Sequence, residues 1–168
     1  MLILYFIAII ILIGIDQLLK FWAVEKLSPV GSIPLLGTKE NPILQFHYLE
    51  NNGAAFSSFA GMRWVLVGLT AVLLVACFLL LLRYYHKSIV FSLGLVLVFS
   101  GGIGNMIDRI FRGGLVVDFI DVAVIHFPVF NFADCCVVIG AFLVAFYMLF
   151  LDKAPKSKQC NEKAEVDD

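Results

Sequence analysis

Two carboxyl side chains, Asp118 and Asp134, have a local setting that suits acid–base chemistry on a carbonyl group. Asp118 stands among the apolar residues 116–120, and Asp134 among the apolar residues 132–136. No basic residue lies within four positions of either one, so no near neighbour in sequence holds the carboxyl group ionised. Two such groups brought together share one proton. The ionised partner can then take a proton from water while the protonated partner polarises a carbonyl, as in aspartic proteases.

Each of these residues has an alternative. Asp121 competes with Asp118, and if residues 116–121 form a strand the two point to opposite faces, so that only one can meet Asp134. A single aspartate at the start of a helix, such as Asp134, is often only a cap.

Other chemistries have no matching pattern in the chain. The sequence contains neither G-x-S-x-G nor H-E-x-x-H. The four cysteines have no metal-ligand spacing and favour buried apolar positions; they are Cys77, Cys135, Cys136 and Cys160. We therefore expect neither a metal nor another cofactor.

Further polar residues gather near the two aspartates, at the ends of apolar segments. They are Asn105, Asp108, Arg109, Arg112 and Asn131, with Asp16 and Lys20 at the end of the first segment. Ionisable groups at the edge of a hydrocarbon core are costly and suggest function. Structural roles are also open: Asp16 and Lys20, four residues apart, can pair on one helix, and Arg109 and Arg112 can hold Asp108 ionised.

The charge pattern shows which elements must position these groups. The chain has 168 residues and is 61% hydrophobic, well above the roughly 45–50% of soluble domains. Four blocks of about 20 residues each, roughly the length that crosses a membrane, hold no charged residue except Asp16 and Lys20. This pattern predicts a mainly α membrane protein with four transmembrane helices at about 2–22, 64–82, 88–107 and 131–151. A soluble enzyme is excluded, and so is a nucleic-acid binder, because basic residues are not in excess.

The loops between the spans carry strand patterns. Residues 43–49 and 115–120 are rich in β-branched and aromatic side chains, and we expect them to form a small β-sheet from the two long loops. Four spans place both termini on one side, and the basic residues favour that side as cytoplasmic, which makes the sheet extracytoplasmic. Residues 1–151 are thus expected to form a single domain, and the polar residues 152–168 a disordered cytoplasmic tail.

Five motifs, in this order, resemble those of signal peptidase II, the bacterial lipoprotein signal peptidase family, from about residue 10 to 150. They are Asp16-Gln17-Leu18-Leu19-Lys20, Asn51-Asn52-Gly53-Ala54-Ala55-Phe56, the stretch from Gly101 to Arg109, Val116-Val117-Asp118-Phe119, and Phe130-Asn131-Phe132-Ala133-Asp134. Each motif alone is weak, but the ordered set is specific. One small departure from the pattern is Cys135, where a serine or another small residue is expected.

The resemblance implies roles for individual residues. Asp118 and Asp134 would be the catalytic pair of a membrane aspartic endopeptidase. Substrate binding or support of the site would fall to Asn51, Gly53, Asn105, Asp108, Arg109 and Asn131, and support of the fold or the site to Asp16 and Lys20.

The resemblance also implies a substrate and a location. The family removes the signal peptide of diacylglyceryl-modified prolipoproteins just before the lipidated cysteine, and globomycin-type inhibitors block it. The protein would then be a multi-pass protein of the bacterial cytoplasmic membrane in contact with membrane lipid, would act as a monomer, and would bind no nucleic acid. A proton-conducting transporter or a non-enzymatic assembly factor fits less well, because the acidic residues cluster at one face instead of spreading through the membrane depth.

Overall fold

The computed structural model describes residues 1–53, 61–125 and 127–152. Within them, four helices are long and apolar enough to cross a membrane, as predicted. They are α1 (Leu2–Trp22), continued by the π-helical η1 (Ala23–Leu27); α2 (Arg63–Tyr84); α3 (Ile89–Phe111); and α4 (Phe132–Phe146), continued by η4 (Tyr147–Leu151). Disorder was predicted for residues 152–168, and of these, residues 153–168 lie outside the described part of the chain.

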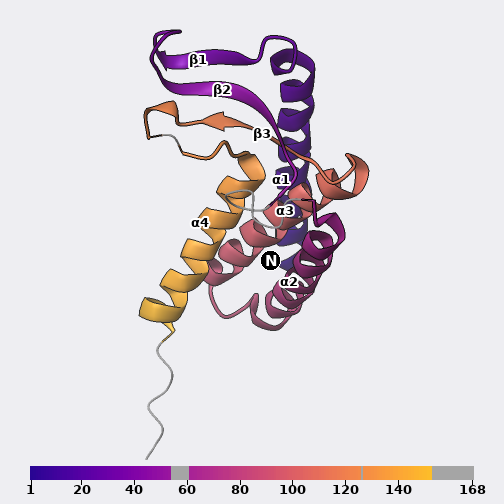
Figure 1. Cartoon of the computed structure of the whole chain (residues 1–168). Helices are drawn as coiled ribbons and strands as arrows, with labels where there is room; N and C mark the ends of the chain where they lie inside the picture. The colour runs from indigo at the N-terminus through magenta and orange to yellow at the C-terminus, as the bar shows by residue number, and fades with distance from the viewer. Residues whose placement is uncertain (54–60, 126, 153–168) are drawn as a thin grey trace, which may run out of the picture.

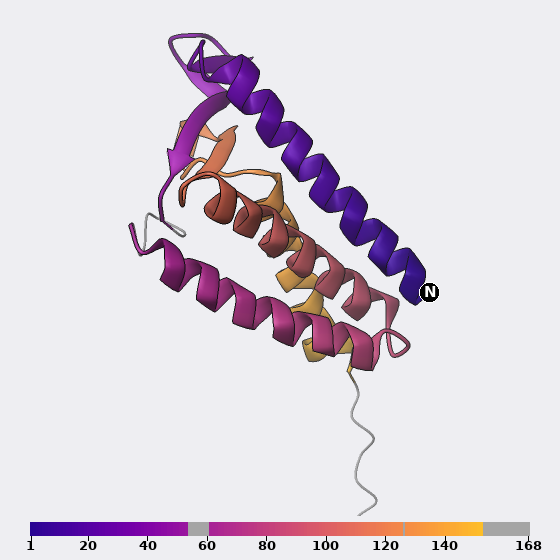
Figure 2. The ribbon, with the colours of Figure 1, turned by 90° about the vertical axis from the view of Figure 1, so that its right-hand side faces the viewer.

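Helix α3 is the central helix of the bundle, and α1, α2 and α4 pack around it (Figures 1 and 2). Its contact with α4 depends on glycine: a Cβ atom added to Gly94 would lie 2.9 Å from the carbonyl oxygen of Gly140. A Cβ atom at Gly101 would likewise collide with the backbone of Ala133. These glycines therefore permit the close approach of α3 and α4.

The ends of two spans differ from the prediction. Helix α3 continues to Phe111, one turn beyond the predicted end at residue 107, and so carries Asp108 and Arg109 on the helix instead of in the loop. The helical backbone that begins with α1 runs on to Leu27. Both extensions carry polar side chains toward the sheet side of the molecule.

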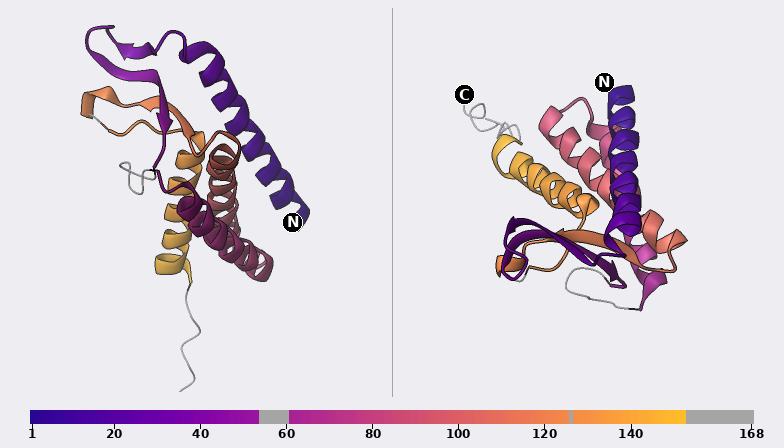
Figure 3. Two further views of the ribbon diagram at one scale, coloured as in Figure 1. Left: turned by 45° about the vertical axis from the view of Figure 1, so that its right-hand side comes forward. Right: turned by 90° about the horizontal axis from the view of Figure 1, so that it is seen from above.

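A three-stranded antiparallel sheet covers one end of the bundle, in the order β1-β2-β3 (Figures 1 and 3). Strands β2 (Pro42–Asn51) and β3 (Val116–Asp121) match the two predicted strands, and a short 3-10 turn, η3 (Ala123–Ile125), follows β3. The edge strand β1 (Ser32–Gly37) was not predicted, because Pro34 and Gly37 interrupt a strand pattern. The beginning of α1 and the end of α4 lie at the end of the bundle away from the sheet (Figure 2).

An apolar cluster holds the sheet against the end of the first span. Ala23 and Leu27 pack against Val117 and Phe119 of β3, and all four are buried. The rings of Trp22 and Phe46 add an edge-to-face contact with centroids 5.2 Å apart. Because Val117 and Phe119 are anchored in this way, the residue between them, Asp118, is fixed in position.

Candidate active site

Asp118 is buried in the middle of β3, with only 2% of its surface exposed. Two amide side chains donate to its carboxylate: Asn51 Nδ2 to Oδ2 at 3.0 Å and Asn131 Nδ2 to Oδ1 at 2.6 Å. Burial raises the pKa of Asp118 to about 6, with a smaller contribution from the negative charge of Asp134, while the two amide bonds oppose the shift. This carboxyl group can therefore hold a proton under mildly acidic conditions.

Asp134 lies in the first turn of α4 and is partly exposed. It forms a capping box with Asn131: each residue's side chain accepts a hydrogen bond from the other's backbone N–H, both at 3.0 Å. Asn105 Nδ2 donates to the second carboxylate oxygen at 2.7 Å. Asp134 thus contributes to the cap of α4, whose N-cap residue is Asn131, and the same contacts place Asp134 in the candidate site.

Asn131 connects the two carboxyl groups. Its side-chain Nδ2 donates to Asp118, its backbone N–H donates to Asp134 Oδ2, and its side-chain Oδ1 accepts from the backbone N–H of Asp134. Asn131 is fully buried, so water does not compete for these bonds. The structure therefore brings Asp118 and Asp134 to one small residue from two elements that are not neighbours in sequence.

Asp121 is not part of this arrangement. Its carboxylate accepts a hydrogen bond from Gln45 Nε2 on β2 at 2.6 Å. No contact to Asn131 or Asn105 is found for it in the described part of the chain. The prediction that only one of the two strand aspartates meets Asp134 is confirmed, and that residue is Asp118.

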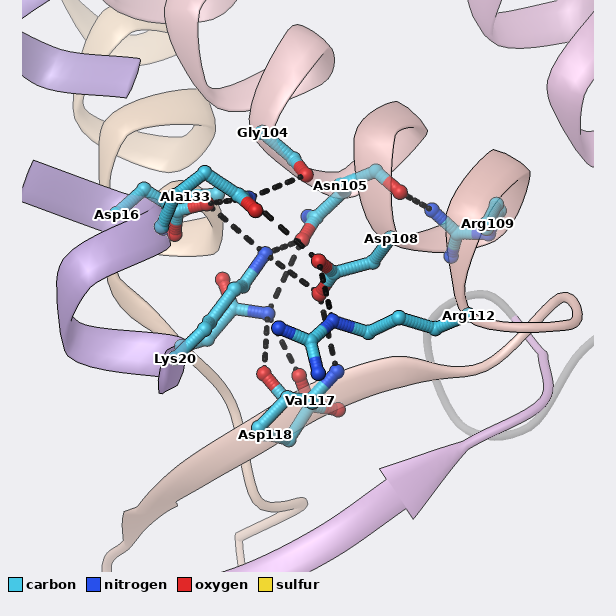
Figure 4. A network of polar contacts seen from close by, with 12 residues as sticks. Asp16, Lys20, Gly104, Asn105, Asp108, Arg109, Arg112, Val117, Asp118 and Ala133 are labelled. Carbon is cyan, nitrogen blue, oxygen red and sulfur yellow. Dashed lines mark hydrogen bonds and ion pairs between the residues drawn. The ribbon is translucent and has the colours of Figure 1, made fainter. Parts of the chain in front are cut away.

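A buried ionic network lies beside Asp118 (Figure 4). Lys20 Nζ is 3.0 Å from Asp16 Oδ2, which confirms the predicted pair within α1, and 3.1 Å from Asp108 Oδ2. Arg112 pairs with the other oxygen of Asp108 at 3.2 Å, as its spacing predicted. These contacts place two carboxylates and two cations together, so their charges balance.

The same network fixes the backbone around the site. Asp108 Oδ2 accepts a hydrogen bond from the backbone N–H of Val117, next to Asp118. Asp16 Oδ1 accepts one from the backbone N–H of Ala133, next to Asp134. A Cβ atom at Gly104 would lie 2.5 Å from Asp16 Oδ2, so the glycine makes room for this carboxylate. The network thus ties each catalytic candidate to the helical bundle through its neighbour.

Gln17 is a site-supporting residue that sequence reasoning did not assign. Its Nε2 donates to Asp16 Oδ2 at 3.0 Å and to the carbonyl oxygen of Gly104 at 3.2 Å. The residue stands inside the first motif, directly after Asp16, and its polar side chain in an apolar span was the available signal.

Arg109 joins the segment after β2 to the site. Its Nη2 donates to the carbonyl oxygen of Gly53 at 2.9 Å, and Nη1 to that of Asn105 at 3.4 Å. Asn51 Oδ1 accepts from the backbone N–H of Gly53 at 2.9 Å, which turns its amide nitrogen toward Asp118. The predicted supporting residues Asn51, Gly53 and Arg109 therefore meet here, whereas residues 54–56 of the same motif lie outside the described part.

The described residues include no group of three His, Cys, Asp or Glu side chains that could hold a metal ion. Cys77, Cys135 and Cys136 are free thiols, and Cys160 lies outside the described residues. The described side chains at the site are thus carboxylates, amides and basic groups, which supply acid–base and hydrogen-bond chemistry.

The buried carboxyl group predicts how stability depends on pH. The pKa of Asp118 lies at about 6 in the folded protein against an ordinary value of 3.8. Because the folded state binds this proton more tightly, the contribution is fully present below pH 4 and is lost as the pH rises through about 6. It amounts to about 3 kcal/mol at most. We expect the free energy of unfolding of the wild type, relative to Asp118→Asn, to fall by this order between pH 4 and 8.

Denaturation of both proteins in detergent micelles at a series of pH values measures this difference. Parallel stability curves for the wild type and Asp118→Asn would contradict the raised pKa. Asp121→Asn is the matched control, since Asp121 lies on the same strand but outside the site.

Comparison with known proteins gives one consistent family. A family model described as "Signal peptidase (SPase) II" matches residues 8–150. The lipoprotein signal peptidase of Clostridioides difficile (strain 630) is 39% identical over 149 residues, covering 89% of this chain and 97% of that protein. That of Enterococcus faecalis (strain ATCC 700802 / V583) is 37% identical over 158 residues, covering 93% and 94%. A solved bacterial membrane enzyme superposes with a TM-score of 0.72 at 26% identity, covering 93% of each chain.

Proposed function

The chain belongs to the signal peptidase II family, and we propose that it removes the signal peptide from diacylglyceryl-modified prolipoproteins by cleaving just before the lipidated cysteine. As a family member it is a multi-pass membrane protease of bacterial type. The observation that carries the catalytic part of the proposal is the bridge made by Asn131 between Asp118 and Asp134. We take residues 1–151 as one protease domain.

The two aspartates have different surroundings, which suggests different roles. Asp134 is partly exposed at the N-terminal end of α4, where the helix dipole favours an anion, and N–H groups donate to both of its oxygens. Asp118 is buried on the strand, where the neutral form is favoured. In the proposed resting state Asp134 is therefore the ionised base and Asp118 the protonated acid.

Cleavage then follows in two steps. Asp134 takes a proton from water, the water oxygen bonds to the scissile carbonyl carbon, and Asp118 gives its proton to the carbonyl oxygen, which leaves a neutral tetrahedral diol. In the second step Asp134 passes its proton to the amide nitrogen, the C–N bond breaks, and Asp118 recovers a proton from the diol. The products are the carboxyl end of the signal peptide and the free amine of the cysteine, and both aspartates return to their starting forms.

The place of the site in the fold suits this substrate. A signal peptide is an apolar segment, and the lipid on the cysteine belongs to the bilayer, so the scissile bond must be met at the membrane edge. Asp134 opens the fourth span and Asp118 lies in the sheet over the ends of the spans (Figure 3). The proposed orientation, with cytoplasmic termini, puts this edge on the extracytoplasmic face, where water is present.

A substrate comparison tests the proposal. We expect the purified protein, reconstituted in liposomes, to cleave a precursor whose cysteine carries diacylglycerol at least ~10²-fold faster than the same unmodified precursor. The reason is that each buried lipid methylene contributes roughly 0.8 kcal/mol of binding, part of which can be used in the transition state. The readout is the released signal peptide together with the N-terminal residue of the product.

The control is a modified precursor in which the residue before the cysteine is proline, whose ring hinders attack at that bond. Equal cleavage of the modified and unmodified precursors, or a product that begins at another residue, would count against the proposed substrate and bond.

A further inference from the structure

Lys20 lies in the last turn of α1, close to Asp118 (Figure 4), and its side chain is 0% exposed. An ammonium group has three N–H donors and no acceptor. Each donor has an acceptor here: Asp16 Oδ2 at 3.0 Å, Asp108 Oδ2 at 3.1 Å and Asn105 Oδ1 at 2.9 Å. Two of these partners neutralise charge, whereas the third is a neutral amide.

The contact with Asn105 decides which way that amide points. Because Lys20 can only donate, the oxygen of Asn105 must face it. The amide nitrogen then faces the other way and donates to Asp134 Oδ1 at 2.7 Å. A chain of two hydrogen bonds thus runs from the buried ammonium group to the proposed base.

Asn131 Nδ2 also donates to Asn105 Oδ1, at 3.1 Å, but this nitrogen has other acceptors within reach. This nitrogen lies within hydrogen-bond distance of Asp118 Oδ1 at 2.6 Å and of the carbonyl oxygen of Val117 at 3.3 Å as well. With two hydrogens for three acceptors, it cannot serve all of them fully. Lys20 is the donor whose hydrogens each have an acceptor of their own.

We propose that Lys20 is a positioning residue for the reaction: by fixing the amide of Asn105, it keeps Asp134 in the ionised form that accepts a proton from water. The inference rests on the proposed function. It assigns to Lys20 a task beyond the ion pairs with Asp16 and Asp108, because charge balance alone does not require the bond to a neutral amide.

Charged groups of both signs lie around Asp134. Asp118 faces it from β3, Asp108 and Arg109 lie on α3, and Asp16 and Lys20 lie on α1. An N–H that donates to a carboxylate oxygen stabilises the ionised form, which is the form a general base needs. Asn105 supplies such a donor to Asp134 at 2.7 Å.

Charge-balanced variants separate positioning from simple stability. Lys20→Met combined with Asp16→Asn removes the cation and one of its anions, and the asparagine oxygen can still accept the N–H of Ala133. Lys20→Met with Asp108→Asn is the second such pair. We expect the folded variants to cleave the lipidated precursor with the acid limb of the pH–rate profile moved up by about one pH unit, a loss of about tenfold below that limb. A merely structural role would lower the unfolding temperature and leave the limb in place.

Two single variants complete the design. Asn105→Asp keeps an acceptor for Lys20 but has no N–H for Asp134, so the limb should move in the same direction. Lys26→Met removes an exposed lysine from the same helical segment, where it pairs only with Glu25, and should leave the profile unchanged.

A folded charge-balanced variant with the wild-type acid limb would overturn the proposal and leave the proposed protease function intact. Failure of the wild type to cleave any lipidated precursor would instead refute the function. If neither double variant folds, infrared spectra of the wild type and Asp134→Asn at pH 5 decide. We expect the protonated-carboxyl bands of the two proteins to agree, and a band present only in the wild type would place a proton on Asp134 and overturn the inference.

Discussion

Replacing either Asp118 or Asp134 with asparagine should reduce the rate of precursor cleavage by at least ~10³-fold, because each variant removes one of the two groups that we propose to move protons. Asp118→Asn keeps an oxygen that can accept the N–H of Asn131 but has no proton to give to the scissile carbonyl. Asp134→Asn keeps an acceptor for the helix cap but cannot take a proton from water. Both variants should fold, since asparagine occupies nearly the same volume.

The measurement is cleavage of the diacylglyceryl precursor at equal amounts of folded protein. Asp121→Asn is the matched control, as a third aspartate on the same strand whose hydrogen bond goes to Gln45, and it should retain activity within about twofold. The double variant should be little slower than either single one, because residues that act as a unit do not contribute additively. Substantial cleavage by Asp118→Asn or Asp134→Asn would exclude that residue from the pair.

Local patterns were sufficient to predict the spans and two of the strands. Charge-free stretches define membrane helices because the cost of a charge in hydrocarbon is paid residue by residue. Val116–Asp121 was recognised as a strand from its own composition, whereas β1 was missed because Pro34 is tolerated only where an edge strand leaves its N–H unpaired.

The catalytic candidates could be selected from the sequence for a related reason. Asp118 and Asp134 are acidic residues in apolar surroundings, and that contrast is visible locally. Their connection is not: Asn131 bridges them only because the start of α4 packs beside β3. The sequence placed Asn131 among the polar residues at the span ends, and only the family resemblance gave it a supporting role at the site.

The ion pair between Lys20 and Asp108 shows where local reasoning stops. Asp16 is four residues from Lys20, so helical spacing predicted that pair. Asp108 lies on another helix, beside Arg109 and Arg112. Nothing in the sequence around Asp108 indicates that Lys20 is a further partner. Only the packing of α1 against α3 brings Lys20 and Asp108 to 3.1 Å.

Lys20→Met should therefore be strongly destabilising, by about 3–5 kcal/mol, because it leaves the buried carboxylates of Asp16 and Asp108 with too little compensating charge. Lys26→Met removes a lysine of the same helical segment from an exposed pair with Glu25, and should change stability by less than about 1 kcal/mol. Denaturation of both variants in detergent micelles measures their free energies of unfolding. Similar losses of this free energy in Lys20→Met and Lys26→Met would show that burying the ion pairs of Lys20 has no energetic consequence.

The double variants show why Lys20→Met destabilises the protein. If the cost of Lys20→Met comes from an unbalanced buried charge, adding Asp16→Asn or Asp108→Asn should recover most of the lost free energy, although it restores no ion pair. If the cost came from lost packing or lost hydrogen bonds, each added substitution would destabilise the protein further. The sign of the second step therefore identifies the cause. A variant that recovers stability while its acid limb stays displaced would show that Lys20 serves the fold by its charge and the reaction by its bond to Asn105.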